Sequence, residues 1–328
     1  MLAQNRGFFA KARAPRSKIS GQSATRYATV EPHSKSLDLR EMSIYRCGRM
    51  TELSQSTTST NPLAETAPWN WVAESYLEIA MPFLALFGER AIECAALQRS
   101  MTVLDVATGP GTLACRMAPL VARVDAIDFS EAMVTHCKQR VSQLGLTNVH
   151  TQLADGQNLP FATAMFDATF SMFGLMFFPD RVRGFREMHR VLKPGGRTFV
   201  TSWAPIDDSP LMLARVAAQQ FANPNVPPPQ RNLMTLEDPE VFLKEMSNSG
   251  FVDVRVEPVT RDYQFRDFEH LFAGITRGSA PIELLKRNVG EAEWERQLSR
   301  MREHLSQTHR TFPLALSSKA WLGSGQKR

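Results

Sequence analysis

The chain has 328 residues, of which 43% are hydrophobic and 22% are charged, and its formal net charge is +5. This length has room for one large domain or two smaller ones, and no apolar run reaches the length of about 20 residues that a membrane span needs. Residues 1–50 carry ten Lys or Arg against three acids, so the remainder of the chain is slightly acidic. The basic face that nucleic-acid binding requires is therefore not expected on the folded part.

The cysteines and histidines show no metal-binding pattern. Cys47, Cys94, Cys115 and Cys137 lack paired ligand spacing, and the histidines do not cluster with them. We expect neither disulfides nor a metal site.

Residues 1–62 are rich in Ser, Thr and Arg without a steady hydrophobic period, which predicts a disordered basic tail. The first thirty residues contain no acid and mix basic with apolar side chains, as mitochondrial transit peptides do. Alternatively, an ordinary cytoplasmic enzyme starts at Met50. A mitochondrial and a cytoplasmic location both stay open, whereas a secretory signal would need a longer apolar core.

Residues 69–97 carry apolar side chains at helical spacing, among them Leu84 and Ile92, and predict an amphipathic helix. Aromatic residues on such a helix mostly serve packing. Two such aromatic residues, Trp71 and Tyr76, lie near the start of this stretch.

Residues 103–114 are the most informative stretch, because an apolar strand containing Asp105 runs into a glycine turn and then a helix from about Thr112. Gly109 and Gly111 permit backbone angles closed to other residues and let a ligand approach the main chain. Dinucleotide folds use such a turn to hold a pyrophosphate. The carboxylate of Asp105 disfavours that ligand, because it repels phosphates and attracts a cationic amino group.

Two further strands are expected to lead into acids. Residues 121–128 predict a buried strand that ends at Asp128, the position that binds ribose hydroxyls in nucleotide folds. Residues 148–154 predict a short strand, which is followed directly by Asp155. Three acids in register after three strands indicate one ligand at the carboxyl edge of a sheet.

The alternation of strands and helices continues. Residues 166–172 predict a fourth strand, and residues 179–192 predict a helix. The Lys-Pro-Gly-Gly sequence at residues 193–196 is expected to turn the chain into a fifth strand at residues 197–203.

The carboxy-terminal part is expected to complete the sheet and to cover it. Residues 236–249 predict a helix stopped by a glycine, and residues 251–257 predict a sixth strand. Residues 314–321 predict a seventh strand. Residues 266–310 are expected to form lid helices.

The motif Asp105-x-x-x-Gly109-x-Gly111 resembles the first motif of class I S-adenosylmethionine-dependent methyltransferases, in which the turn wraps the methionine end of the cofactor. The sequence at residues 186–196 resembles the methyltransferases grouped as type 11, which mostly act on small molecules. The resemblance implies an α/β fold with a doubly wound, seven-stranded, mostly parallel Rossmann-like sheet, whose seventh strand is antiparallel and inserted beside the fifth. Past residue 203 the resemblance is loose.

The resemblance also implies roles for individual residues. S-adenosylmethionine is the implied cofactor, with Asp128 on its ribose and Asp155 on its adenine amino group. The implied cofactor-binding residues are Tyr76, Asp105, Thr108, Gly109, Gly111, Asp128, Phe129, Asp155, Gly156 and Ser171. His270, in the expected lid, is the candidate base, although methyl transfer from a sulfonium can proceed by alignment alone. The expected domains are the tail at 1–62, a cofactor-binding core at 63–205, and strands with a substrate lid at 206–328.

The expected function is methyl transfer, by in-line displacement, to a small apolar molecule such as a quinone, phenol, sterol or lipid precursor. The loop at residues 172–178 is apolar and should line the substrate pocket. It lacks the Asn/Asp-Pro-Pro-aromatic motif of base-directed amino methyltransferases. Two alternatives remain, a nicotinamide-dependent oxidoreductase that uses the same turn and a cofactor-binding protein without turnover. Neither the acceptor atom nor the oligomeric state follows from the sequence.

Overall fold

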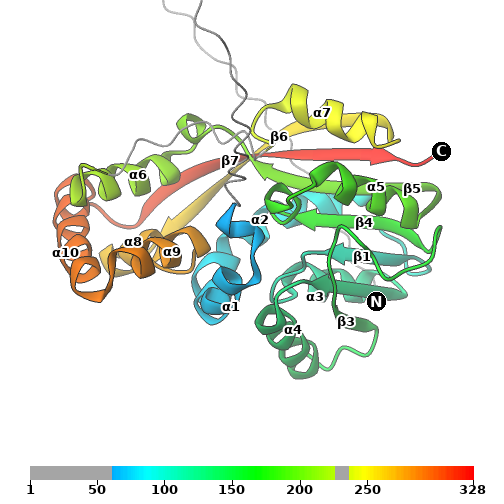
Figure 1. The fold of residues 1–328 in the computed structure, drawn as a ribbon, viewed down its shortest axis with the longest axis horizontal. Coiled ribbons are helices and arrows are strands. Elements are labelled where there is room, and N and C mark those ends of the chain that lie inside the picture. Colours follow the sequence, from blue (N-terminus) through cyan, green and yellow to red (C-terminus); the bar gives the residue numbers. More distant parts are fainter. Residues whose placement is uncertain (1–60, 226–235) are drawn as a thin grey trace, which may run out of the picture. The chain divides into compact units, whose positions relative to one another are not determined.

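The structure is a computed structural model, and it describes residues 61–225 and 236–328 (Figure 1). The predicted tail or transit peptide at 1–62 lies outside the described residues except for its last two. All described residues belong to one compact unit. Within the described ranges, no helix is long and apolar enough to cross a membrane.

Seven strands form one sheet in the order β3-β2-β1-β4-β5-β7-β6. The pairs from β3 to β5 are parallel, whereas β7 is antiparallel to both β5 and β6. The strands are β1 (Thr102–Val106), β2 (Arg123–Asp128), β3 (Val149–Leu153), β4 (Phe166–Met172), β5 (Leu192–Trp203), β6 (Val252–Phe265) and β7 (Leu314–Gln326). The predicted mostly parallel Rossmann-like sheet, with its antiparallel strand beside β5, is confirmed.

Helices connect the strands and cover the sheet. The longer ones are α1 (Thr66–Ser75), α2 (Met81–Ala95), α3 (Thr112–Met117), α4 (Glu131–Gln143), α5 (Arg181–Val191), α6 (Pro210–Ala222), α7 (Pro239–Asn248), α8 (Phe268–Thr276), α9 (Ala280–Val289) and α10 (Glu291–Thr308). The short turns are η1 (Pro62–Ala64), η2 (Tyr76–Ala80), η3 (Ala118–Leu120), η4 (Leu175–Phe177) and η5 (Ile206–Asp208).

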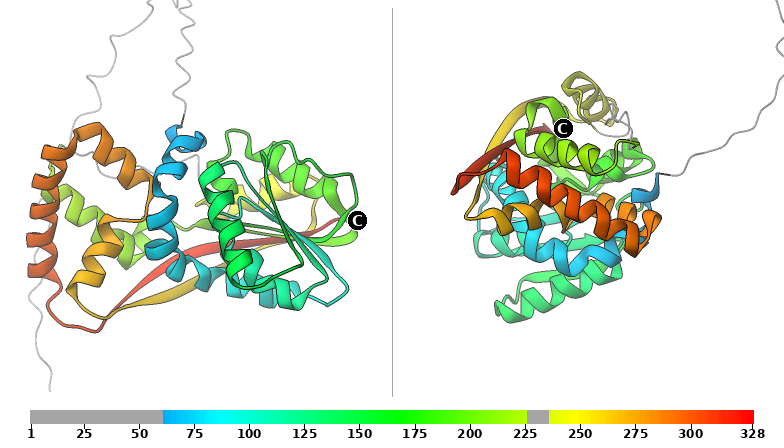
Figure 2. Two further views of the ribbon diagram at one scale, coloured as in Figure 1. Left: turned by 90° about the horizontal axis from the view of Figure 1, so that it is seen from below. Right: turned by 90° about the vertical axis from the view of Figure 1, so that its left-hand side faces the viewer.

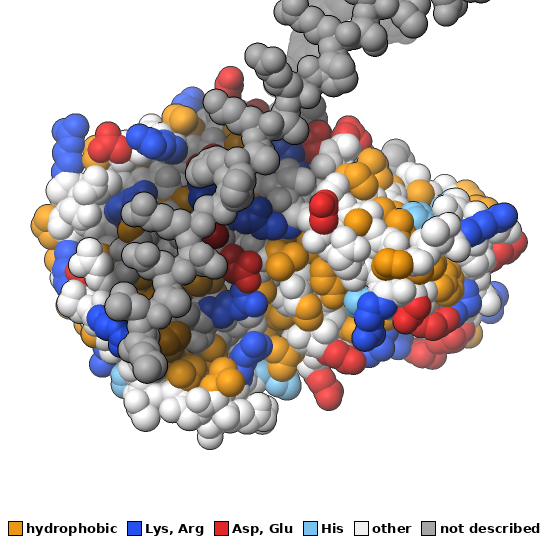
Figure 3. Space-filling view, turned by 180° about the vertical axis from the view of Figure 1, so that it is seen from behind, with side chains coloured by type: hydrophobic (Ala, Val, Ile, Leu, Met, Phe, Trp, Pro, Cys, Tyr) orange, Lys and Arg blue, Asp and Glu red, His pale blue; other side chains and the backbone are white. Residues whose placement is uncertain are grey.

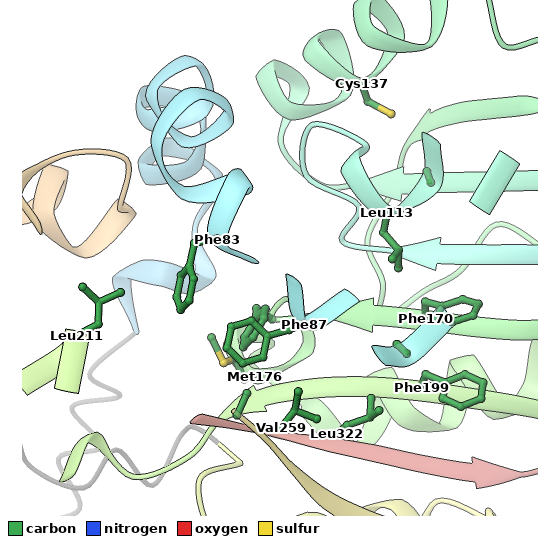
Figure 4. Close-up of a cluster of buried hydrophobic side chains, with 14 of the residues drawn as sticks. Phe83, Phe87, Leu113, Cys137, Phe170, Met176, Phe199, Leu211, Val259 and Leu322 are labelled. Carbon is green, nitrogen blue, oxygen red and sulfur yellow. The ribbon is translucent and has the colours of Figure 1, made fainter. Parts of the chain in front are cut away.

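The two faces of the sheet carry separate hydrophobic clusters, because alternate residues of a strand point to opposite faces. Val103 of β1 packs in the cluster that contains Phe87 of α2 and Leu113 of α3, part of which Figure 4 shows. The next residue, Leu104, packs in the other cluster with Phe185 of α5. Both residues of β1 are fully buried, as expected for a parallel strand covered on both sides.

Strands β6 and β7 are longer than the sequence predicts, and they pair from Val252–Gln326 to Phe265–Leu314. The prediction ended the sixth strand at residue 257, whereas the strand runs on through Pro258, which has no N–H to donate. The strand continues because β6 is the edge strand of the sheet, where proline is tolerated.

The predicted turn at residues 193–196 is also corrected. It lies inside β5, which starts at Leu192 and pairs irregularly with β4 between Phe166 and Ala168. Gly195 adopts a φ of +80° within this irregular part. The turn is therefore a local distortion of one strand and not a separate connection.

Helices α6, α8, α9 and α10 gather at the end of β6 and β7 that lies away from β1 to β3 (Figures 1 and 2). The expected lid segment thus consists of α8, α9 and α10. Figure 3 shows Lys and Arg side chains together with Asp and Glu side chains on the face that it draws.

Candidate active site

The site lies at the carboxyl edge of the parallel strands, where the strand order reverses between β1 and β4. Ligands bind at such a point in open α/β folds, because the connections on its two sides leave in opposite directions. The turn after β1 carries Gly109 and Gly111, whose φ angles are +56° and +76°. A Cβ atom on Gly111 would overlap the Sγ atom of Cys137 in α4. Glycine is thus required here by both backbone conformation and packing.

Asp128 ties the end of β2 to this turn. Its carboxylate accepts hydrogen bonds from the N–H of Gly109 at 2.8 Å and from the N–H of Ser130 at 2.9 Å. Only 5% of the Asp128 surface is exposed. Burial raises the pKa of Asp128 to about 6, although these two N–H groups lower it.

Asp105, near the end of β1, is a second buried acid at the same edge. Its carboxylate accepts a hydrogen bond of 2.7 Å from the hydroxyl of Thr108. Burial raises the pKa of Asp105 to about 7; the Thr108 hydrogen bond lowers it, and the charge of Asp128 raises it. Neither Asp105 nor Asp128 forms an ion pair with any Lys, Arg or His of the described ranges. The edge is therefore electronegative and suited to a cation.

A cavity of about 260 Å³, which we name the Asp128 cavity, opens in front of this edge. The predicted residues Tyr76, Gly109, Asp128, Phe129, Asp155 and Gly156 all line it. Asp155 is exposed, and its carboxylate accepts a hydrogen bond of 2.8 Å from the N–H of Gln157. The structure thus brings together six of the ten residues that the sequence nominates for the cofactor.

A smaller cavity of about 50 Å³, the Asp105 cavity, continues from the first one. It is lined by Asp105, Thr108 and Gly109 together with Arg116 of α3. The Arg116 side chain is paired with Glu89 of α2. Arg116 was missed at the sequence level, because nothing in its position after the glycine turn distinguishes it from an ordinary exposed helix residue.

A third cavity of about 340 Å³, the Trp203 cavity, lies on the other side of Tyr76 and Phe173. Its walls come from α2, α6, α8, α9 and the ends of β5 and β6, and they are largely apolar. Figure 4 shows three wall residues, Phe83, Met176 and Leu211, coming from three separate elements. Tyr76 and Phe173 line all three cavities, so these two side chains stand where the cavities meet.

Phe173 has a φ of +59°, which is unusual for a bulky residue. Its ring stacks on Trp203 with centroids 4.2 Å apart, and its N–H donates to the Thr201 hydroxyl at 3.0 Å. These contacts hold the strained backbone in place. The sequence predicts an apolar loop here, and the structure adds that one aromatic ring of the loop separates the cavities.

Tyr76 lies at an irregular turn between helices α1 and α2. Between α1 and α2, residues Tyr76–Ala80 form one π-helical turn. Pro82 has no N–H to donate to Glu78, the carbonyl four residues earlier, and this explains the local change of hydrogen bonding. Such π turns recur at functional sites. Burial raises the pKa of Tyr76, and the charge of Asp128 adds to this.

Three predicted residues do not line any of these cavities. Ser171 is fully buried, and its hydroxyl accepts a hydrogen bond of 3.2 Å from the N–H of Leu175, so it shapes the loop after β4. Gly111 lies behind the turn against Cys137. His270 stands behind Tyr263, with its Nε2 atom 3.3 Å from the Tyr263 hydroxyl.

Among residues 61–225 and 236–328, no group of His, Cys, Asp and Glu is arranged to hold a metal ion. Cys94, Cys115 and Cys137 are free thiols.

Comparison with known proteins identifies relatives of this fold and site. The methyltransferase domain model matches residues 103–196. An uncharacterized protein of Mycobacterium tuberculosis is 35% identical over 141 residues, which make up 43% of this chain and 51% of that protein. The chain thus spans about half the length of the mycobacterial relatives that it matches.

The ubiquinone/menaquinone biosynthesis C-methyltransferase UbiE of Klebsiella pneumoniae is 35% identical over 182 residues, covering 50% of this chain and 72% of UbiE. Among solved structures, the YcgJ protein from Bacillus subtilis is 19% identical with a TM-score of 0.49, and the match covers 75% of this chain and 97% of that chain.

The sheet order and the cavity at its carboxyl edge define a Rossmann-like α/β protein with a nucleotide-type site. The match to UbiE and the methyltransferase domain model then narrow this class. The chain belongs to the class I S-adenosylmethionine-dependent methyltransferases, a family whose cofactor is S-adenosylmethionine.

Proposed function

We propose that the protein transfers a methyl group from S-adenosylmethionine to a small, largely apolar acceptor. The observation that carries this proposal is the pair of buried acids, Asp105 and Asp128, beside cavities that meet an apolar cavity at Tyr76 and Phe173. Two carboxylates without a cationic partner fit a ligand that brings its own positive charge and hydroxyl donors.

We propose that the cofactor spans the two smaller cavities. The carboxylate of Asp128 would accept hydrogen bonds from the ribose hydroxyls, and Asp155 would accept from the adenine amino group. Asp105, with Thr108, would face the ammonium group, and Arg116 would face the carboxylate of the methionine end. The three acids would thus accept hydrogen bonds from the donor groups of the cofactor, and the guanidinium of Arg116 would pair with the carboxylate of the cofactor.

When bound, S-adenosylmethionine supplies a methyl group on a positively charged sulfur. The chain would contribute alignment and the exclusion of water, which can account for most of the acceleration of an in-line displacement. The rings of Tyr76 and Phe173 would form the passage between donor and acceptor. His270 has no place in this proposal as a base, because its ring lies behind Tyr263.

The apolar walls of the Trp203 cavity support an apolar acceptor, and a quinone ring is our leading candidate among the four classes that the sequence suggests. The Klebsiella relative is named as a ubiquinone/menaquinone biosynthesis C-methyltransferase, which favours this candidate. The nicotinamide alternative is less well supported, because Asp105 would repel a pyrophosphate. Asp128 does not distinguish the two cofactors, since an acid at this position also binds the ribose of a dinucleotide.

The test is calorimetry with S-adenosylmethionine, followed by incubation of the protein with the methyl-labelled cofactor and fractions of a metabolite extract. Binding together with label in a small molecule supports the proposal. Binding without label in any fraction would favour the third possibility, a cofactor-binding protein without turnover. No binding by the parent protein would refute the proposal.

For location, we propose the cytoplasm, because the comparisons give the mitochondrial alternative no support. Fusion of residues 1–62 to a fluorescent protein tests this, and import into mitochondria would contradict it.

A further inference from the structure

The Trp203 cavity contains a half-buried cation, Arg215, that the apolar-acceptor proposal leaves unexplained. Arg215 lies on α6 and lines this cavity, but neither of the two smaller ones. Its Nη2 atom donates to the carbonyl oxygen of Gly274 in α8 at 3.1 Å. Its Nε atom is buried without a hydrogen-bond partner among the described residues. The guanidinium therefore has a buried donor that the described part of the chain leaves unsatisfied.

No carboxylate of the described ranges forms an ion pair with Arg215. Among the described residues, two others on the cavity wall are charged. Arg277 pairs with Glu78 at 3.6 Å, and Glu237 also has an interaction partner. Burial lowers the pKa of Arg215 to about 10, so the side chain is still charged at neutral pH. A charge that is partly shielded from water and has no counterion is costly, and a ligand of opposite charge would offset that cost.

We propose that the acceptor substrate of this site carries a carboxylate at one end of an apolar body, and that Arg215 binds it. A single guanidinium balances one negative charge, which fits a carboxylate better than a phosphate ester of nearly two charges. Because Arg215 is absent from the walls of the other two cavities, the carboxylate would anchor the end of the substrate that lies away from the transferred methyl group. This inference rests on the proposed function and narrows its substrate class.

The competing explanation is structural. Gly274 lies in the last turn of α8, and an arginine that bonds a carbonyl there stabilises the helix end. That role uses Nη2 alone and requires no charge balance in the cavity.

The experiment compares two carboxylates with their neutral amides, 2-naphthoate with 2-naphthamide and decanoate with decanamide. Calorimetry and thermal shift are run on the parent, Arg215→Met and Arg215→Lys, with and without S-adenosylhomocysteine. We expect at least one carboxylate to bind the parent about tenfold or more tightly than its amide. This preference should vanish in Arg215→Met and persist in part in Arg215→Lys.

Equal binding of acids and amides by the parent, or no binding of any probe, overturns the proposal. So does a preference that survives in Arg215→Met. A melting temperature that falls in Arg215→Met and recovers in Arg215→Lys, without a carboxylate preference in the parent, assigns the residue to the end of α8. Binding of S-adenosylmethionine is measured separately, so its failure would refute the methyltransferase proposal without deciding the role of Arg215.

Discussion

The carboxylate of Asp128 accepts a hydrogen bond of 2.8 Å from the N–H of Gly109, and so joins the end of β2 to the glycine turn after β1. The residue that we propose for the ribose therefore also fixes the turn that borders it. A change of Asp128 acts on both parts of the site, and a well-chosen substitution must preserve the shape of the side chain.

Asp128→Asn retains an acceptor oxygen for the N–H of Gly109 but loses the negative charge, and its NH2 group replaces the oxygen that accepts from the N–H of Ser130. We expect affinity for S-adenosylmethionine to fall about 10- to 100-fold, because charge-assisted hydrogen bonds to two hydroxyls become neutral ones. Calorimetry measures this. The matched control is Asp125→Asn, a buried acid of the same strand that pairs with Arg123 and lines none of the three cavities. Equal losses in both variants would contradict the assignment.

Asp105→Asn should stabilise the empty protein at neutral pH. The pKa of Asp105 is about 7 in the folded protein and about 4 in an unfolded chain. The folded state therefore binds more protons between these values, and the free energy of unfolding of the parent falls as pH rises from about 4 to about 7. Above pH 7, the buried negative charge of Asp105 lowers the free energy of unfolding of the parent by at most ~4 kcal/mol.

The asparagine variant lacks this titration. Its advantage in melting temperature over the parent should be absent near pH 4, grow as pH rises, and level off above pH 7. Melting curves at a series of pH values measure the difference. An advantage in melting temperature that stays constant with pH would mean that Asp105 is not the titrating group. The affinity of the same variant for S-adenosylmethionine, compared with that of the parent, measures the contribution of the Asp105 charge to cofactor binding.

Gly111→Ala tests the packing behind the turn. It forces a Cβ atom into a φ of +76° and against Cys137, and we expect a loss of ~2–4 kcal/mol in unfolding free energy. Gly145→Ala is the control, since Gly145 has a φ of +62° and no atom within 4 Å of an added Cβ. This control should cost only ~1–2 kcal/mol. The second change Cys137→Ala should recover part of the difference, and no recovery would argue against the overlap.

The sequence was sufficient for the parts of the site that follow strand ends. Asp128 and Asp155 were predictable because an acid that ends or follows a parallel strand lies at the carboxyl edge of the sheet, where ligands bind. Trp203 and Arg215 were not, since the Trp203 cavity is assembled from elements between Leu63 and Pro281 whose proximity depends on tertiary packing. The length of β6 was missed for a similar reason, because only its place at the sheet edge allows Pro258 within it.

Phe173 offers a direct measurement of the strain at the junction of the cavities. At ordinary backbone angles, alanine is more stable than glycine, because glycine loses more conformational freedom on folding. At the φ of +59° of Phe173 this order should reverse, with Phe173→Gly more stable than Phe173→Ala by ~1 kcal/mol. Phe170, buried in the regular strand β4, is the matched control, and there the alanine variant should be the more stable one.

Both Phe173 variants remove the ring that stacks on Trp203, so turnover should fall in each regardless of stability. If alanine were the better substitute at both positions, the backbone at Phe173 would carry no strain and its role would reduce to the ring alone.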